Sequence, residues 1–170
     1  MQMDSEAAEL LIRRIREDEI GEVSLILEEA ALWLKREGRD MWTEKQYSVR
    51  GLLDSYTVAD MYLGFLDQQA VATMVLQEKD LLFGADDHKP CLYLHKLAAR
   101  RSYARTGMAA QMITWAKRMA AARGKHTLRL DCAADRPRLC EFYEKQGFVK
   151  VREALILNQY PTAFYEIRID

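Results

Sequence analysis

The sequence lacks three features that would restrict its class at once: paired cysteine motifs, a long apolar run and an excess of charge of one sign. Its three cysteines, Cys91, Cys132 and Cys140, show no CxxC spacing, which argues against a disulfide framework and against a structural zinc site. We therefore expect reduced, mostly buried thiols. No stretch approaches the roughly 20 apolar residues that cross a bilayer, and a net charge of -1 provides no basic surface for nucleic acid or an anionic membrane.

Proline is also scarce, and the sequence shows no linker and no internal repeat. Only three prolines interrupt 170 residues, of which 49% are apolar, so we expect residues 1–170 to form one domain with a sizeable core. The first residues include Asp4, Glu6 and Glu9, where a signal peptide would have basic and then apolar residues. These observations favour a cytoplasmic protein.

Apolar periodicity predicts the element order β-α-α-β-β-β-α-β-α-β-β. A helical crossover between the strands at 91–99 and 126–131 makes those two strands parallel. The polar stretch 79–89 is expected to be a loop. The expected strands cover 10–16, 61–66, 71–77, 91–99, 126–131, 148–156 and 163–169, and the expected helices cover 20–36, 45–53, 107–123 and 137–146.

The turn at 104–109 has the character of an anion site. It joins a strand to a helix whose first backbone N–H groups have no partner within the helix. Gly107 allows close approach of the main chain, and Arg100, Arg101 and Arg105 bring positive charge. A pyrophosphate fits such a turn, although a glycine there also serves a turn that binds nothing.

Two tracts, 94–117 and 128–148, together resemble the GNAT family of N-acetyltransferases. Gly107 and Ala109 match the family's phosphate-loop pattern, and Leu130-Asp131-Cys132 through Phe142-Tyr143 to Gly147-Phe148 look like its second half. Two positions depart from the family: Ala104 stands where Gln or Arg is usual, and Arg136 where Asn is frequent.

The resemblance implies an α/β (α+β) fold. Its centre would be a mixed, mostly antiparallel sheet of about seven strands, flanked by about four helices, with parallel, splayed strands four and five. It also implies acetyl-CoA as co-substrate and no metal. The pantetheine arm would pair with strand four, and an N–H near Leu97 would polarise the thioester carbonyl. The implied cofactor contacts are Leu97, Ala98 and Ala99 on that strand, Arg105, Thr106, Gly107, Met108, Ala109 and Ala110 at the pyrophosphate, and Arg136 and Tyr143 beyond them.

The reaction implied by the family is direct attack of a neutral amine on the thioester in a ternary complex. Tyr143 matches the family tyrosine that protonates the departing thiolate; read alone, it is equally a core aromatic beside Phe142. His95 is the candidate base, because the run 94–98 resembles strand four of arylalkylamine N-acetyltransferases. A merely hydrogen-bonded His95 is the alternative, and Asp131 and Glu78 are other candidate bases.

The sequence offers weaker evidence for catalytic or acceptor-binding roles of several other residues. We do not expect an acyl-Cys132 intermediate, because direct transfer needs no protein nucleophile. Trp33 is expected in the core, whereas Trp42 and Tyr47 line either an acceptor pocket or the core, and Tyr160-Pro161 is a possible rim. The acceptor, a small-molecule amine or a protein amino group, is left open, as is a homodimer through the C-terminal edge strands.

Two rival functions match fewer of these sequence features. A non-catalytic acyl-CoA sensor would keep the cofactor site without the proton-transfer groups, and Tyr143 counts against it. A dinucleotide-binding oxidoreductase would need an early G-x-G-x-x-G, which the chain lacks.

Overall fold

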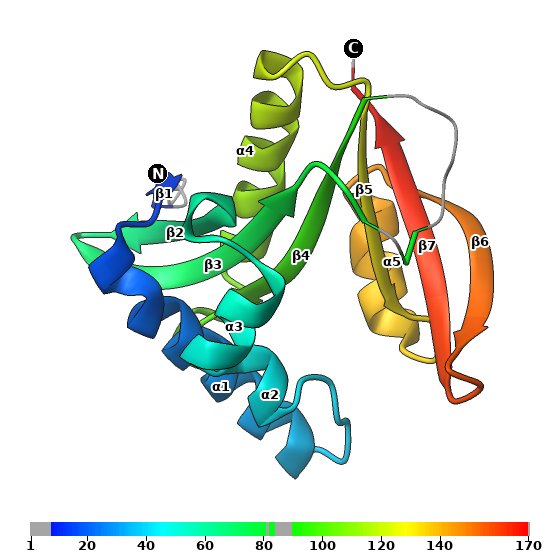
Figure 1. Cartoon of the computed structure of the whole chain (residues 1–170), viewed down its shortest axis with the longest axis horizontal. Coiled ribbons are helices and arrows are strands. Elements are labelled where there is room, and N and C mark those ends of the chain that lie inside the picture. The colour runs from blue at the N-terminus through cyan, green and yellow to red at the C-terminus, as the bar shows by residue number, and fades with distance from the viewer. Residues whose placement is uncertain (1–7, 81, 84–89, 170) are drawn as a thin grey trace, which may run out of the picture. The chain divides into compact units, whose positions relative to one another are not determined.

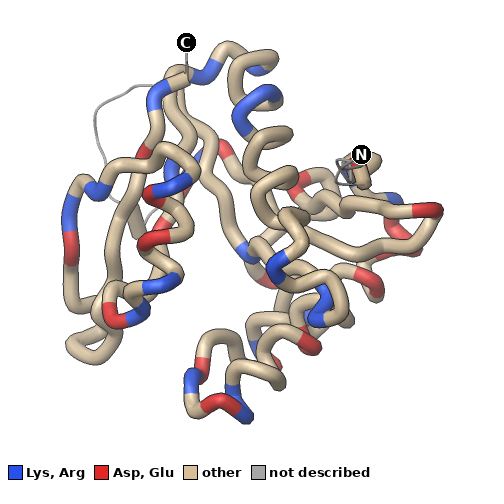
Figure 2. Tube along the Cα trace, turned by 180° about the vertical axis from the view of Figure 1, so that it is seen from behind, with Lys and Arg blue, Asp and Glu red and all other residues tan. Residues whose placement is uncertain are grey.

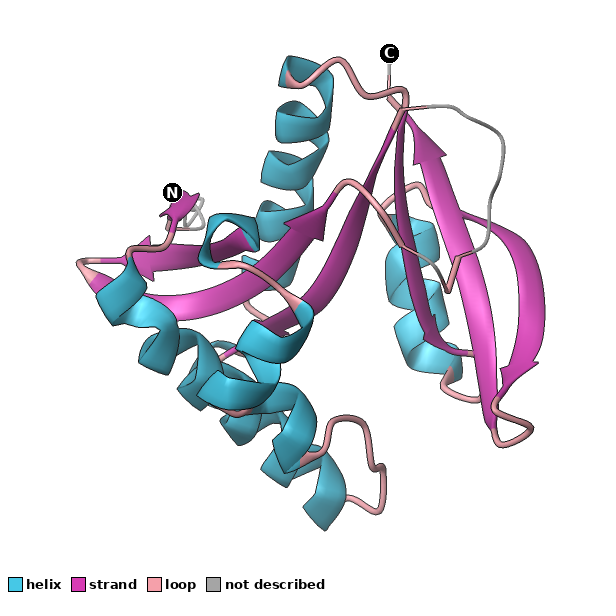
Figure 3. Cartoon of the chain, in the orientation of Figure 1, coloured by secondary structure: helices cyan, strands magenta, loops and turns pink. Residues whose placement is uncertain are grey.

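The computed structural model describes residues 8–80, 82–83 and 90–169, and this part of the chain forms seven strands and five α-helices (Figures 1 and 3). The strands are β1 (Leu11–Arg14), β2 (Met61–Leu66), β3 (Gln69–Gln77), β4 (Cys91–Ala99), β5 (Thr127–Ala133), β6 (Val149–Ile156) and β7 (Tyr160–Arg168). The helices are α1 (Ile20–Arg36), α2 (Glu44–Tyr47), α3 (Val49–Ser55), α4 (Met108–Ala122) and α5 (Pro137–Lys145).

The seven strands form a mixed sheet in the order β1-β2-β3-β4-β5-β7-β6. The β1–β2, β2–β3, β5–β7 and β6–β7 ladders are antiparallel, whereas β4 and β5 are parallel, as predicted. The β4–β5 ladder joins Cys91–Tyr93 to Thr127–Arg129, and no described pair continues it to His95, although both strands do continue. The parallel ladder therefore has three pairs, and the predicted splay of the two strands stays a prediction.

Contacts divide the chain into two compact units, the first formed by 1–75 and 96–112 and the second by 76–95 and 113–170. Both β4 and α4 begin in one unit and end in the other. The expectation of one domain over residues 1–170 stays a prediction.

The first unit has a core between helices and strands. Val23, Ile26 and Leu27 of α1 and Leu52 of α3 are fully buried against Met61 and other residues of β2 and β3, so α1 and α3 cover one face of these strands (Figure 1). This apolar stripe is what the 3.6-residue periodicity of 20–36 predicts. At Gly64 in β2 a Cβ atom would lie 2.9 Å from the Met112 sulfur, so the missing side chain leaves room for α4.

The predicted helix at 45–53 is instead two helices, α2 and α3, which raises the helix count from about four to five. Ser48 divides them because its backbone is extended, with φ −63° and ψ 156°, and its Oγ accepts a hydrogen bond from Gly51 N at 3.0 Å. An N-cap serine of this kind starts a new helix.

The second unit contains a smaller core of Phe83, Cys91, Tyr93 and Phe164. Arg129 of β5 is 3% exposed and lies beside this core, with its Nε 3.0 Å from Glu166 Oε2 and its Nη1 donating to Tyr93 Oη at 3.3 Å. The buried guanidinium is thus both ion-paired and hydrogen-bonded, as a buried charge must be.

The remaining boundaries agree with the predictions to within a few residues. The predicted hairpin closes through Asp67 and Gln68, whose positive φ values of 47° and 68° are those of a two-residue type I′ turn. Part of the predicted loop at 79–89, namely residues 81 and 84–89, lies outside the described residues, as do Asp4 and Glu6. Between Lys96 and Arg129 every charged residue is Lys or Arg, whereas both signs occur over the rest of the described chain (Figure 2).

Candidate active site

In the first unit, the end of β4 carries the predicted pantetheine contacts. Leu97 and Ala99 are half-buried and Ala98 is buried. The preceding residue, Lys96, has φ 53°, a left-handed conformation in the middle of a strand. A residue in this conformation interrupts regular pairing and turns the next N–H out of the ladder direction. The local backbone therefore fits the predicted carbonyl-polarising N–H near Leu97.

The predicted phosphate turn leads into α4 in the same unit. Gly107 has φ 86° and its carbonyl accepts the first helical hydrogen bond, from Gln111 N at 3.0 Å. Arg105, Thr106 and Gly107 are exposed, Ala109 and Ala110 are half-buried and Met108 is buried. A Cβ added at Gly107 would meet nothing within 4 Å. Open space in front of a helix N-terminus fits a pyrophosphate.

The three arginines near this turn have different surroundings. Arg100 donates from Nε to Ala70 O at 2.8 Å and lies 2.9 Å from Glu22 Oε2. The guanidinium of Arg101 stacks 3.4 Å above the Trp33 ring. Both side chains are therefore engaged with the first unit's own residues, and Arg105, which is exposed with φ 62°, is the arginine best suited to a phosphate.

In the second unit, Tyr143 lies on the inner face of α5 and is 9% exposed. Its ring packs edge-on against Phe142 and Phe148, with centroids 5.3 Å and 6.0 Å away. Burial, and then the nearby Cys132, raise the pKa of the Tyr143 hydroxyl above its ordinary value. The phenol therefore stays protonated through the neutral pH range and is available as a proton donor.

Cys132 and Cys140 lie close together in this unit, with their sulfur atoms 3.9 Å apart. The Cys140 thiol also donates to the carbonyl of Ala133 at 3.6 Å. Burial, together with the neighbouring Cys140, raises the pKa of the Cys132 thiol. These surroundings favour the neutral thiol, which is a poor nucleophile.

His95 is grouped with two carboxylates. Asp80, which follows β3, and Asp131 of β5 each have an oxygen within 4.8 Å of a His95 ring nitrogen and of each other. Asp131 was a candidate base, but Asp80 was not predicted, since it falls in a stretch expected to be a polar loop. Glu78, the other candidate base, is instead 3.3 Å from Lys125 Nζ.

The remaining predicted residues lie elsewhere. Arg136 is half-buried at the N-cap of α5, where its carbonyl accepts from Leu139 N at 3.1 Å. Trp42 and Tyr47 pack against the first unit's core, which agrees with their structural interpretation, and Lys96 Nζ lies 5.5 Å from the Trp42 ring. Trp33 is half-buried beneath Arg101.

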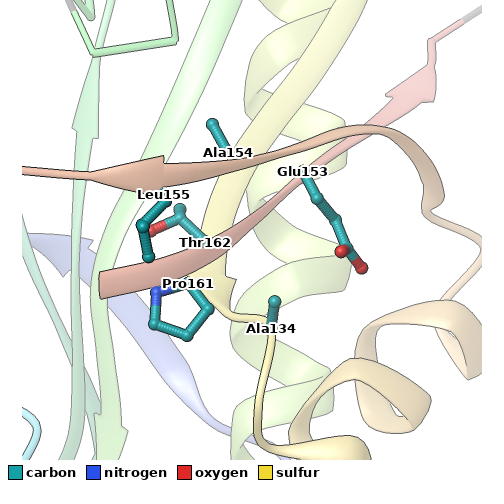
Figure 4. Close-up of a pocket in the computed structure, with 6 residues that line it drawn as sticks. All are labelled: Ala134, Glu153, Ala154, Leu155, Pro161 and Thr162. Atoms are coloured by element: carbon teal, nitrogen blue, oxygen red, sulfur yellow. The ribbon is translucent and has the colours of Figure 1, made fainter. Parts of the chain in front are cut away.

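A pocket in the second unit is lined by none of these residues. Figure 4 shows its lining between the paired ends of β6 and β7 and the residue after β5. Pro161, from the predicted rim, contributes to it, whereas the adjacent Tyr160 is 54% exposed. The lining residues are Ala134, Glu153, Ala154, Leu155, Pro161 and Thr162, none of which was predicted as a catalytic or cofactor residue.

Comparison with known proteins decides the family. The model of the Acetyltransferase (GNAT) family matches residues 27–148, which include β2 to β5, the turn at Gly107 and all of α5. The chain belongs to the GNAT acetyltransferase family. The predicted acetyl-CoA-dependent acetyltransferase is thereby confirmed as the class of enzyme.

Individual relatives of this acetyltransferase support the same family assignment. It is 30% identical over 130 residues to the uncharacterized N-acetyltransferase YesJ of Bacillus subtilis, with 72% of each chain covered. A GNAT acetyltransferase structure from Streptococcus agalactiae has a TM-score of 0.78 at 16% identity, with 95% of each chain covered. The yncA structure from Salmonella typhimurium, which contains its cofactor acetyl-CoA, has a TM-score of 0.71 at 10% identity and the same coverage.

These structural likenesses confirm the predicted fold and leave the roles of individual residues as predictions. Among the described helices of this acetyltransferase, none is both long and apolar enough to span a membrane.

Proposed function

We propose that this acetyltransferase moves the acetyl group of acetyl-CoA to a primary amine by direct attack in a ternary complex. The observation that carries the proposal is the turn before α4, where Gly107 leaves open space at the start of a helix. A helix N-terminus concentrates N–H groups and partial positive charge, which suits a diphosphate.

Residues of the first unit would hold the cofactor. The N–H groups from Arg105 to Ala110 would take the pyrophosphate, with the exposed Arg105 side chain in place of the residue that Ala104 cannot supply. Leu97, Ala98 and Ala99 would pair with the pantetheine amides. The N–H after Lys96 would stabilise negative charge on the thioester oxygen as the tetrahedral centre forms.

Residues of the second unit would move the protons. The amine nitrogen forms a bond to the carbonyl carbon, the carbon–sulfur bond breaks, and the electron pair leaves with the sulfur. Tyr143 donates its phenolic proton to that thiolate; a phenol of ordinary pKa, about 10, already holds this proton at neutral pH, and the raised pKa of Tyr143 does not change that. His95, with Asp131 as the alternative, accepts the proton that the attacking nitrogen loses, directly or through water.

The acceptor is proposed only as a class, an amine that is neutral when it attacks. An alkylamine has a pKa of about 10, so a nearby carboxylate pair with an imidazole suits its capture and deprotonation. Both a small-molecule amine and a protein amino group satisfy this chemistry. A non-catalytic acyl-CoA sensor is the second candidate, and turnover separates it from the enzyme.

The test is calorimetric titration with acetyl-CoA of the protein and of two variants, Gly107→Glu and Gly107→Ala. Both variants strain the positive φ of 86°, but only the glutamate adds a carboxylate at the open space. We expect Gly107→Glu to weaken binding at least about 100-fold and Gly107→Ala less than about tenfold. Equal affinities in all three proteins would contradict the proposed phosphate site.

Turnover is then measured by release of the CoA thiol over a panel of amines. Acetylation of any primary amine, abolished or slowed in His95→Gln, supports the mechanism. Tight acetyl-CoA binding without turnover of any amine or protein amino group would favour the sensor.

A further inference from the structure

Three side chains that are far apart in the sequence meet in the second unit. Asp80 follows β3, His95 lies in β4 and Asp131 lies in β5, and one nitrogen or oxygen of each is within 4.8 Å of the other two. His95 Nε2 and Asp80 Oδ2 are 3.8 Å apart, too far for a hydrogen bond. The Asp80 and His95 side chains are only 9% and 16% exposed.

The Asp80 carboxylate supplies an independent observation. Its Oδ1 accepts a hydrogen bond from Leu82 N at 2.9 Å, whereas its Oδ2 is buried and accepts none from the described residues. This oxygen is the one that faces His95. A buried carboxylate oxygen is unfavourable unless it is paired or coordinates a metal.

We propose that Asp80, His95 and Asp131 bind a divalent transition-metal ion, with Zn²⁺ the best match. Imidazole nitrogen suits zinc and discriminates against Mg²⁺ and Ca²⁺, and carboxylate oxygens complete the usual zinc donor set. Three protein ligands leave a fourth position for water. With the imidazole neutral, two carboxylates balance the charge of the ion.

The separations are close to what zinc requires. Bonds of about 2.0–2.2 Å in a tetrahedron place ligand atoms about 3.3 Å apart. The 3.8 Å between His95 and Asp80 must therefore close by about 0.5 Å. The largest separation allowed by the cluster, 4.8 Å, must close by about 1.5 Å, which is within the reach of side-chain rotation.

A metal ion on His95 would occupy the lone pair that accepts a proton in the proposed function. Zinc would then inhibit acetyl transfer. The binding itself does not depend on that function, so it is measured with acetyl-CoA and amine absent.

The first experiment titrates the chelator-treated, full-length protein with ZnCl₂ by calorimetry, alongside Asp80→Asn and the matched control Asp135→Asn. Asp135 is an exposed aspartate outside the cluster. We expect Asp80→Asn to weaken zinc binding more than about 100-fold, since loss of even an outer-shell partner costs 10–100-fold, and Asp135→Asn to change it less than about twofold. No zinc binding by the intact protein, or equal affinity in both variants, would overturn the proposal.

A second measurement excludes the cysteines, because Cys132 lies next to Asp131 in the sequence and its sulfur is 3.9 Å from that of Cys140. Co²⁺ replaces Zn²⁺, and the absorption spectrum is recorded for the protein and for a Cys132→Ser/Cys140→Ser double variant. We expect d–d bands of an N/O site in both, without a thiolate charge-transfer band. A thiolate band that vanishes together with binding in the double variant would assign the metal to the cysteines and overturn the proposal.

Asp80→Asn could fail to bind zinc because it folds poorly. The midpoint of thermal unfolding, measured with and without zinc, separates that defect from the loss of a metal ligand. Zinc that binds the native state raises the midpoint of thermal unfolding, by an amount that grows with the logarithm of the ratio of free zinc concentration to Kd. We expect a rise for the intact protein and for Asp135→Asn, and none for Asp80→Asn. An equal rise in all three proteins would contradict the assignment.

Discussion

The sulfur atoms of Cys132 and Cys140 lie 3.9 Å apart, and both side chains are half-buried. Such a pair resembles two small apolar groups more than a nucleophile with a neighbouring base. The burial that raises the pKa of the Cys132 thiol also works against a thiolate at neutral pH.

Replacement of Cys132 by alanine should therefore leave acetyl transfer within about threefold of the parent rate, because no acyl group passes through the sulfur. The measurement is steady-state release of CoA thiol, with mass spectrometry of the protein after acetyl-CoA is added alone. A stable acetyl adduct on Cys132, together with loss of turnover in the variant, would show that the thiol is on the reaction path.

Replacement of Tyr143 by phenylalanine should lower kcat by about 10²-fold with little change in KM for acetyl-CoA, because the variant loses a proton donor and keeps the ring packing. The raised pKa of Tyr143 adds a pH prediction. If the phenol must be protonated, activity should persist through pH of about 10, the ordinary phenol pKa, and fall only above it. A loss of activity confined to KM would instead indicate a packing role.

Replacement of Gly51 by alanine should destabilise the first unit strongly. A Cβ at this position would lie 1.8 Å from the carbonyl oxygen of Lys45, so the α2–α3 junction must move. Overpacking against backbone costs about 1–3 kcal/mol or more. The comparison is Gly21→Ala in α1, where a Cβ meets nothing within 4 Å and the free energy of unfolding should rise by about 0.5–1 kcal/mol. Urea unfolding measures both, and equal effects at the two glycines would contradict the described junction.

Glu19 should stabilise the fold in a pH-dependent way. Its carboxylate is 12% exposed and accepts two hydrogen bonds from Arg13 at 2.7 Å and one from Arg16 N at 2.8 Å. Hydrogen bonds from Arg13, before other causes, lower the Glu19 pKa from 4.5 to about 2. A lowered native pKa stabilises the fold above pH 4.5, and that stabilisation is lost as the pH falls toward 2.

Replacement of Glu19 by glutamine should therefore lower the free energy of unfolding at pH 7 by about 1–2 kcal/mol, a modest figure because Arg13 is partly exposed. The gap between parent and variant should narrow between pH 4.5 and 2. Asp18→Asn is the control, since Asp18 is 78% exposed and should change stability by less than about 0.5 kcal/mol. A gap that is constant with pH would contradict the role of the charge.

Periodic apolar residues made most of the fold predictable. The bounds of α1 and β4 were predicted to the residue, because a long amphipathic stripe and a run of buried β-prone residues each leave one interpretation. The division at Ser48 was not predictable in this way, since it depends on one hydroxyl and on the space available to Gly51.

The candidate site was predictable only where its residues are contiguous. The turn at Gly107 shows its chemistry in a few successive residues, whereas Asp80 joins His95 and Asp131 only after three segments fold together. Local sequence also predicted positive charge near the turn without indicating that Glu22 and Trp33 would engage Arg100 and Arg101.

Because β4 and α4 each contain residues of both units, the way the two units are encoded limits how they can be inherited. Neither unit is encoded by an uninterrupted piece of gene, since each is assembled from two separate stretches of chain. Recombination that exchanges a contiguous segment would divide a strand or a helix, so the two units are expected to be inherited together. Variation in the acceptor would then arise by point substitution and loop change rather than by shuffling of modules.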